Sequence, residues 1–293
     1  MKKTVFTGAG VAIVTPFKKD MTIDYDKLGE LIEYQIANST DAIVICGTTG
    51  EASTLTDEEH RETIRYAVKK VDGRIPVIAG TGSNDTAYAI ELTMFAKNTG
   101  ADAYLNVTPY YNKTTQRGLI RHFFAIADSV DLPCILYNVP GRTGMTITPE
   151  TYKELSQHPN IVATKEASGN VGDIVRILDL CGDDLDIYSG EDGLITPILS
   201  LGAKGVISVL SNIKPRETHD ICAEFFKGNI SASAELQIKY SRLIDALFCE
   251  TNPIPVKTAL NILGFDVGAC RLPLCDMSAM NIERLRNELE NVK

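Results

Sequence analysis

Short apolar runs rich in Val, Ile and Ala recur along the chain, and a segment with helical periodicity follows each of them. Runs of this kind predict buried β-strands, because β-branched residues favour an extended backbone. We expect strands at 10–17, 41–48, 75–82, 101–109, 133–140, 161–168, 185–192 and 204–211. The pattern therefore predicts eight consecutive strand–helix units.

Start and stop signals mark the helices between these strands. One helix is expected to open at Thr56, a preferred N-cap residue, and to end at Gly73. A second is expected to run from a cap at Ser83 to Gly100. These signals agree with the apolar periodicity and strengthen the prediction of alternating strands and helices.

Alternating apolar strands and helices are typical of parallel sheets whose faces are covered by helices. An open, doubly wound sheet and a closed barrel both fit this alternation. Eight units favour the barrel, and the sequence lacks the GxGxxG and Walker A motifs of nucleotide-binding open sheets. We expect an α/β fold, a (β/α)8 TIM barrel over residues 1–225, with a C-terminal helical subdomain over 226–293.

Composition adds limits on partners and compartment. The 293 residues are 44% hydrophobic and 23% charged, and the net charge of −9 argues against nucleic-acid and anionic-membrane partners. No apolar run is long enough to span a membrane, and glycines and Pro16 interrupt the apolar start of the chain, unlike a signal peptide. The seven cysteines form no CxxC pair, so we expect reduced core thiols in a cytoplasmic protein.

A charged residue, Lys165, ends the apolar run IVATKEAS. By itself the run allows a solvated lysine or a desolvated one. Burial lowers the pKa of a lysine, and the neutral amine can attack a carbonyl to form a Schiff base. Tyr137 lies 28 residues earlier, one repeat of the pattern, so both side chains are expected at the same height on neighbouring strands. Because barrel chemistry takes place at the C-terminal strand ends, this spacing favours the desolvated lysine.

Two other strand ends carry candidate binding groups. The motif GTTGE at 47–51 fits a tight turn, or an anion cradle in which Thr48 and Thr49 bind a carboxylate through amides and hydroxyls. Arg142 is either a surface charge or a bidentate clamp for a carboxylate. No His or Cys spacing indicates a metal, and the acidic run SGEDG at 189–193 fits a turn better than a Mg²⁺ site, so no metal is expected.

The motifs GTTGE, TPYYN, LYNVPGRTG and TKEAS, in this order and spacing, resemble those of the dihydrodipicolinate synthase (4-hydroxy-tetrahydrodipicolinate synthase) family. The resemblance covers nearly the whole chain, from GAGVAIVTPF to NPIPVKTAL at 252–260. GTTGE and the strand lysine alone indicate the wider superfamily of pyruvate-dependent class I aldolases, which includes N-acetylneuraminate lyase. The second tyrosine of TPYYN and the arginine of LYNVPGRTG narrow the resemblance to the synthase family.

The resemblance implies a Schiff-base aldol condensation of pyruvate with L-aspartate 4-semialdehyde, a lyase reaction of lysine and diaminopimelate biosynthesis that uses no cofactor. It implies that Lys165 forms the Schiff base and that Tyr137, Thr48 and Tyr111 relay protons. The implied substrate-binding residues are Thr49 for the pyruvate carboxylate, Arg142 for the carboxylate of the aldehyde, and Gly190 and Ile207.

The resemblance also implies a homo-oligomer, a tight dimer that usually pairs into a tetramer, in which the tyrosine matching Tyr111 reaches the neighbouring subunit's site. A regulatory lysine pocket is implied at the tight-dimer interface, with candidate residues Ala52, Ser53, His60, Asn84, Tyr88 and Tyr110. Lysine-sensitive members carry a glutamate where this chain has Tyr88, and some carry a histidine in place of Asp57. Loss of a carboxylate from a site for a cation predicts weak inhibition by lysine.

Two alternatives remain at this point. A sister enzyme, N-acetylneuraminate lyase or a 2-keto-3-deoxy sugar acid aldolase, would share Lys165 and Tyr137 but would not need Arg142 or Tyr111. A non-catalytic barrel that serves as a binding protein would not need Lys165 at all, so the intact set of catalytic residues argues against it.

Overall fold

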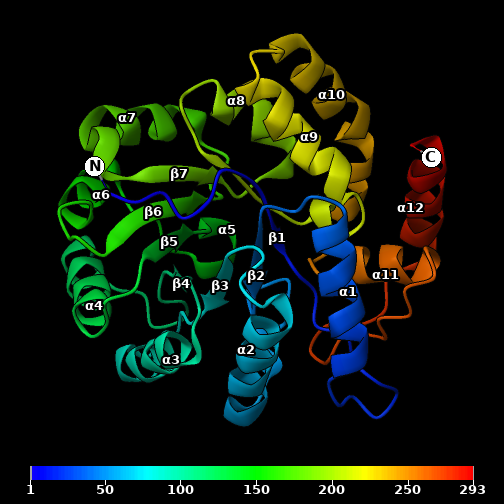
Figure 1. Cartoon of the computed structure of the whole chain (residues 1–293), viewed down its shortest axis with the longest axis horizontal. Coiled ribbons are helices and arrows are strands. Elements are labelled where there is room, and N and C mark those ends of the chain that lie inside the picture. The colour runs from blue at the N-terminus through cyan, green and yellow to red at the C-terminus, as the bar shows by residue number, and fades with distance from the viewer. Residues whose placement is uncertain (1, 293) are drawn as a thin grey trace.

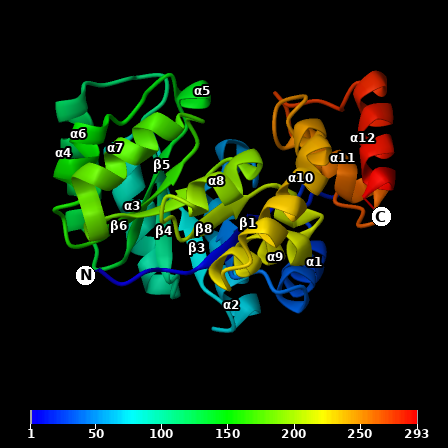
Figure 2. The same cartoon turned by 90° about the horizontal axis from the view of Figure 1, so that it is seen from above.

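The computed structural model describes residues 2–292 and contains a closed barrel of eight parallel strands in the order β1 to β8 (Figures 1 and 2). The strands are β1 (Gly8–Ala12), β2 (Ala42–Ile45), β3 (Val77–Gly80), β4 (Ala103–Val107), β5 (Cys134–Asn138), β6 (Ile161–Glu166), β7 (Asp186–Ser189) and β8 (Gly205–Ser208). The prediction of a TIM barrel is confirmed. The first strand begins earlier than expected, and residues 13–17 lie beyond its end.

The helices surround the barrel and continue past it (Figure 1). They are α1 (Tyr25–Ala37), α2 (Asp57–Val71), α3 (Thr86–Thr99), α4 (Gln116–Asp128), α5 (Pro140–Thr143), α6 (Pro149–Leu155), α7 (Val171–Cys181), α8 (Ile195–Leu199), α9 (Pro215–Phe226), α10 (Ile230–Leu247), α11 (Ile254–Ile262) and α12 (Ala279–Asn291). Within residues 2–292, no helix combines the length and the apolar character that a bilayer crossing requires.

Caps fix where the helices begin. Thr56 caps α2 as predicted, in a capping box with Glu59 that satisfies two backbone donors. The expectation for Ser83 is wrong, because Asp85 caps α3 by accepting a hydrogen bond from the Ala87 amide. Ser83 instead accepts from the amide of Asp85 within the preceding turn. Two acceptors two residues apart are equivalent as sequence signals, and the path of the turn selects one.

The barrel interior is filled by side chains from all parts of the sheet. The Tyr188 ring stacks on Phe6 at a centroid distance of 4.3 Å, and its hydroxyl donates to the Phe6 carbonyl. The sheet closes where β1 pairs with β8, and Gly8 and Gly205 are partners there. A Cβ on Gly205 would lie 1.9 Å from the Gly8 carbonyl oxygen, so this seam requires glycine.

The C-terminal helices α10, α11 and α12 pack beside the barrel, with α10 against α9 and α12 against α10 and α11 (Figures 1 and 2). Their buried side chains, such as Leu243, Leu260 and Leu285, belong to the same apolar cluster as Ile32 of α1 and Ile45 of β2. The helical character expected for this region is therefore present, and its core is continuous with the barrel wall. A separate subdomain that begins at residue 226 stays a prediction.

The cysteines only partly follow the expectation of core thiols. All seven are free, and Cys46, Cys134, Cys181 and Cys222 are buried. The expectation is wrong for the other three, because Cys249 and Cys270 are half-buried and Cys275 is exposed.

Candidate active site

Lys165 and Tyr137 lie side by side at the C-terminal end of the barrel. They are register partners on β6 and β5, which confirms the height deduced from their spacing. The Lys165 ammonium nitrogen lies 4.5 Å from the centre of the Tyr137 ring, and both side chains are buried, with 6% of each exposed. The solvated alternative for Lys165 is therefore excluded. A desolvated amine next to a phenol is an arrangement suited to nucleophilic attack with proton transfer.

The GTTGE motif forms a tight loop directly after β2. Its turn uses the amides of Gly50 and Glu51, which donate to the carbonyls of Gly47 and Thr48. Among the residues that the structure describes, no hydrogen bond is made by the amides of Thr48 and Thr49. These two neighbouring amides remain free to bind an anion. The tight turn is therefore confirmed, whereas the anion cradle stays a prediction that the unused amides of Thr48 and Thr49 permit.

A cavity of about 410 Å³ opens beside Tyr137. It brings together eight of the residues proposed from the sequence: Thr48, Tyr137, Arg142, Ala52, Ser53, His60, Tyr88 and Tyr110. The other six, all within the described part of the chain, do not line it: Lys165, Thr49, Tyr111, Asn84, Gly190 and Ile207. The Lys165 ammonium lies over the ring of Tyr137, which does line the cavity, and Ile207 packs in the same apolar cluster as that ring.

Arg142 lies on the short helix α5, which directly follows β5. Its side chain is exposed, and its guanidinium donates to the carbonyl of Asn252 at 3.1 Å. The remaining guanidinium donors are available to a carboxylate in the cavity. Gly190, at the end of β7, packs so closely on the end of β6 that a Cβ there would lie 2.5 Å from the Cβ of Ala167.

The TPYYN loop holds its two tyrosines differently. Tyr110 lines the cavity, and its carbonyl accepts a hydrogen bond from Asn84 at 3.2 Å. Tyr111 is 94% exposed and has a φ of 68°, a left-handed conformation that is unfavourable for a bulky residue. A large exposed side chain on a strained backbone marks Tyr111 as a candidate contact residue.

Five of the six regulatory candidates line the cavity: Ala52, Ser53, His60, Tyr88 and Tyr110. Burial lowers the pKa of His60, whose Nε2 lies 2.8 Å from the Gly80 carbonyl. The Tyr88 hydroxyl donates to Asp57 at 3.0 Å, and burial together with this carboxylate raises the pKa of Tyr88 to about 12. Asp57 also accepts from Arg61 at 2.7 Å. The carboxylate nearest to Tyr88 is thus already paired.

The sequence analysis did not identify Glu166, the carboxylate next to Lys165 in the chain, as part of the site. Glu166 follows Lys165 on β6, so its side chain faces away from the barrel interior, where it accepts from Asn138, Tyr152 and the Ser168 amide. Burial raises the pKa of Glu166 despite these bonds. The charged run in TKEAS was the available indication of this network, which holds the end of β6.

The acidic run after β7 is a structural turn. Asp192 is buried, and its Oδ2 accepts from the amides of Val209 and Leu210, both at 2.9 Å. Burial raises the pKa of Glu191 and of Asp192. Across residues 2–292 no cluster of three or more His, Cys, Asp or Glu side chains could hold a metal ion.

Comparison with known proteins agrees with the motifs. Residues 5–292 match the model of the dihydrodipicolinate synthetase family. The 4-hydroxy-tetrahydrodipicolinate synthases of Acetivibrio thermocellus and Clostridium tetani are 55% and 57% identical over 291 and 289 residues, which cover 99% and 98% of both chains. A solved structure, the chloride-inhibited dihydrodipicolinate synthase of Acinetobacter baumannii complexed with pyruvate, is 46% identical and superposes with a TM-score of 0.96 over 99% of both chains. The chain therefore belongs to the dihydrodipicolinate synthetase family.

Proposed function

We propose that Lys165 forms a Schiff base with pyruvate and that the resulting enamine attacks L-aspartate 4-semialdehyde. The activity of the chain is the 4-hydroxy-tetrahydrodipicolinate synthase reaction of lysine and diaminopimelate biosynthesis, a lyase-type class I aldolase condensation, as in the relatives that carry this name. One observation carries the choice of nucleophile. Lys165 is buried and faces the ring of Tyr137, its register partner on the neighbouring strand.

The chemistry follows from an amine nucleophile in this position. The Lys165 amine attacks the keto carbon of pyruvate, and loss of water leaves a cationic imine. This imine withdraws electrons, so the methyl group loses a proton and becomes a nucleophilic enamine, which attacks the aldehyde carbon. Each step moves a proton, and we assign the relay to Tyr137, Thr48 and Tyr111. Positioned proton transfer of this kind contributes about 10²- to 10⁴-fold.

The two substrate carboxylates are assigned to separate groups. Thr48 and Thr49, whose amides are unused by the loop, would hold the pyruvate carboxylate. Arg142, on the cavity wall, would hold the carboxylate of the aldehyde. Gly190 and Ile207 would complete the pyruvate site. The sister lyase finds no support among the relatives compared above, since all of them are named as synthases.

A shared site between subunits is supported by Tyr111. Its exposure and its left-handed backbone are explained if the ring enters the site of a second copy across a tight dimer. A Tyr111→Phe subunit and a Lys165→Ala subunit, each inactive alone, should then regain activity when mixed. Mixtures that stay inactive, although the subunits exchange, would contradict the shared site. We also propose the further pairing of such dimers into a tetramer, and the cytoplasm as its compartment, which suits the seven free cysteines.

The central test is chemical trapping. The protein is incubated with pyruvate, reduced with borohydride and digested, and the modified peptide is mapped by mass spectrometry. We expect a reduced pyruvyl adduct on Lys165 and none in a Lys165→Arg variant. Folded protein that yields no adduct on Lys165 would overturn the Schiff-base mechanism. Rates with L-aspartate 4-semialdehyde against N-acetylmannosamine then separate the synthase from a sialic acid lyase.

A further inference from the structure

The loop that carries Thr48 and Thr49 is held from a distant part of the chain. The Nδ2 of Asn252 donates to the Thr49 hydroxyl oxygen at 2.9 Å, and both residues are buried. Asn252 lies between α10 and α11, so the bond joins the barrel mouth to the C-terminal helices. A buried amide that donates to the Thr49 oxygen occupies its acceptor side. The hydroxyl proton is then directed elsewhere and remains available as a donor.

The next residues of the loop are anchored to the same C-terminal region. The Glu51 carboxylate accepts from the Lys257 ammonium at 2.8 Å and from the Arg271 amide at 2.9 Å. Lys257 also donates to the carbonyls of Thr15 and Ala269, so all three of its N–H donors are used. Glu51 itself is in the left-handed conformation, with a φ of 55°. The side-chain contacts of Glu51 therefore hold a backbone turn that is unfavourable by itself.

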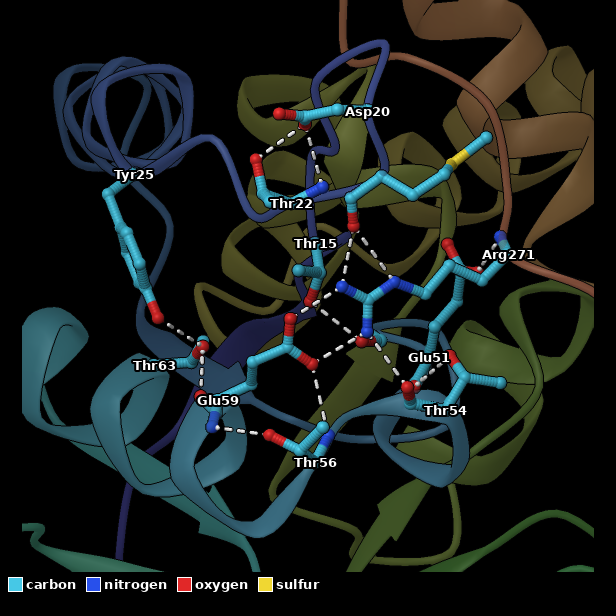
Figure 3. A network of polar contacts seen from close by, with 12 residues as sticks. Thr15, Asp20, Thr22, Tyr25, Glu51, Thr54, Thr56, Glu59, Thr63 and Arg271 are labelled. Carbon is cyan, nitrogen blue, oxygen red and sulfur yellow. Dashed lines mark hydrogen bonds and ion pairs between the residues drawn. The ribbon is translucent and has the colours of Figure 1, made fainter.

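Arg271 extends this attachment to the start of α2 (Figure 3). Its guanidinium donates to both oxygens of Glu59 and to the carbonyls of Met21 and Thr54. Thr54 lies three residues beyond Glu51, in the short helical turn that follows the loop. The loop is thus held at its Thr49 side by Asn252 and at its far end by Lys257 and Arg271.

From these contacts we infer that Asn252 is a positioning residue for pyruvate: it orients the Thr49 hydroxyl as a donor to the pyruvate carboxylate, in a loop that Lys257 and Glu51 hold in place. The inference rests on the proposed function, in which Thr49 binds that carboxylate. Asn252 also accepts from Arg142, but through its backbone carbonyl, which every side-chain substitution retains. Substitution of Asn252 should therefore affect pyruvate and spare the aldehyde.

Steady-state kinetics test this asymmetry. We expect Asn252→Ala to raise the KM for pyruvate about fivefold, the effect of one ordinary hydrogen bond, with kcat and the KM for L-aspartate 4-semialdehyde unchanged. Asn252→Asp keeps the size of the side chain, but its carboxylate can only accept a hydrogen bond from the Thr49 hydroxyl and adds a negative charge, so its KM for pyruvate should rise further. The control is Asn229→Ala before α10, which removes an exposed hydrogen bond to Glu224 and should leave both KM values unchanged.

A double-mutant cycle shows whether Asn252 acts through Thr49. Thr49→Val removes the hydroxyl, and adding Asn252→Ala to it should raise the KM for pyruvate no further. Additive effects, equal rises in both KM values, or an unchanged KM for pyruvate in Asn252→Ala would overturn the inference. If Asn252→Ala does not fold, the Asp variant, which conserves packing, decides by the same criterion.

Borohydride trapping separates this inference from the proposed function. Wild-type protein without a pyruvyl adduct on Lys165 would remove the mechanism itself. If the wild type is trapped and the Asn252→Ala variant binds pyruvate as tightly as the wild type, only the role of Asn252 is refuted. We expect the variant to be trapped fully at saturating pyruvate and to need about fivefold more pyruvate for half-maximal trapping.

Discussion

The buried pair between Lys257 and Glu51 allows a stability prediction that can be worked from its geometry. The side chains are 2% and 1% exposed, and the charged atoms lie 2.8 Å apart. At an effective dielectric constant of 20, their attraction is about 6 kcal/mol. Desolvation costs several kcal/mol for each ion and offsets most of this gain. The intact pair is therefore close to neutral, whereas either charge alone is costly.

We expect Lys257→Met to destabilise the protein by about 3–5 kcal/mol, because it leaves the Glu51 carboxylate buried with the Arg271 amide as its remaining partner. For a chain of this size the midpoint of thermal unfolding should fall by roughly 6–10 °C. The double variant Lys257→Met/Glu51→Gln removes both charges and should regain more than half of the loss. Burial lowers the pKa of Lys257 while Glu51 opposes that shift, which is consistent with a desolvated ion that depends on its partner.

The assay is thermal unfolding followed by circular dichroism at one fixed protein concentration, since association stabilises the folded state by mass action. Lys239→Met is the matched control. Lys239 is exposed on α10, and its substitution should change stability by less than about 0.5 kcal/mol. A Lys257→Met midpoint within 1 °C or so of wild type, or a double variant as unstable as the single one, would refute this account of the pair.

Three further predictions concern substrate, regulation and pH. Arg142→Ala should lower kcat/KM for L-aspartate 4-semialdehyde by about 10- to 100-fold through loss of charged hydrogen bonds, with the KM for pyruvate unchanged; full activity would favour a sister lyase. Sub-millimolar lysine should inhibit the wild type weakly and a Tyr88→Glu variant more strongly in initial-rate assays, because the cavity then gains a carboxylate for the ligand's ammonium. Strong inhibition of the wild type would contradict the weak inhibition predicted from the sequence. Burial lowers the pKa of His122 from 6.5 to about 4, so below pH 6.5 the unfolded state binds the extra proton. The free energy of unfolding therefore decreases as the pH falls from about 6.5 to about 4, by up to roughly 1.4 kcal/mol per pH unit. In that window the urea midpoint of His122→Gln should depend less on pH than the midpoint of the wild type.

Local patterns along the chain were enough to predict the strands and helices that carry the site. Spacing alone set Tyr137 and Lys165 one repeat apart, and they are register partners, because each βα unit advances the sheet by one strand. Thr56 caps its helix as predicted, because a capping box involves residues only three apart. The assignment of a function to these positions depended on the motifs and their order, which resemble one family.

The tertiary structure decided which residues hold that site. Asn252 and Thr49 are 203 residues apart, and Lys257 and Glu51 are 206 apart, so no periodicity along the chain relates them. A lysine inside the apolar run IPVKTAL resembles the lysine that ends IVATKEAS, yet the two have different partners. Lys165 lies against an aromatic ring, whereas Lys257 gives all three donors to protein oxygens. The sequence by itself determined the repeating units and the chemistry at their ends. Closure of the barrel and packing of the C-terminal helices against it determined which lysine has its N–H donors bonded to protein oxygens, because that depends on the acceptors brought within reach.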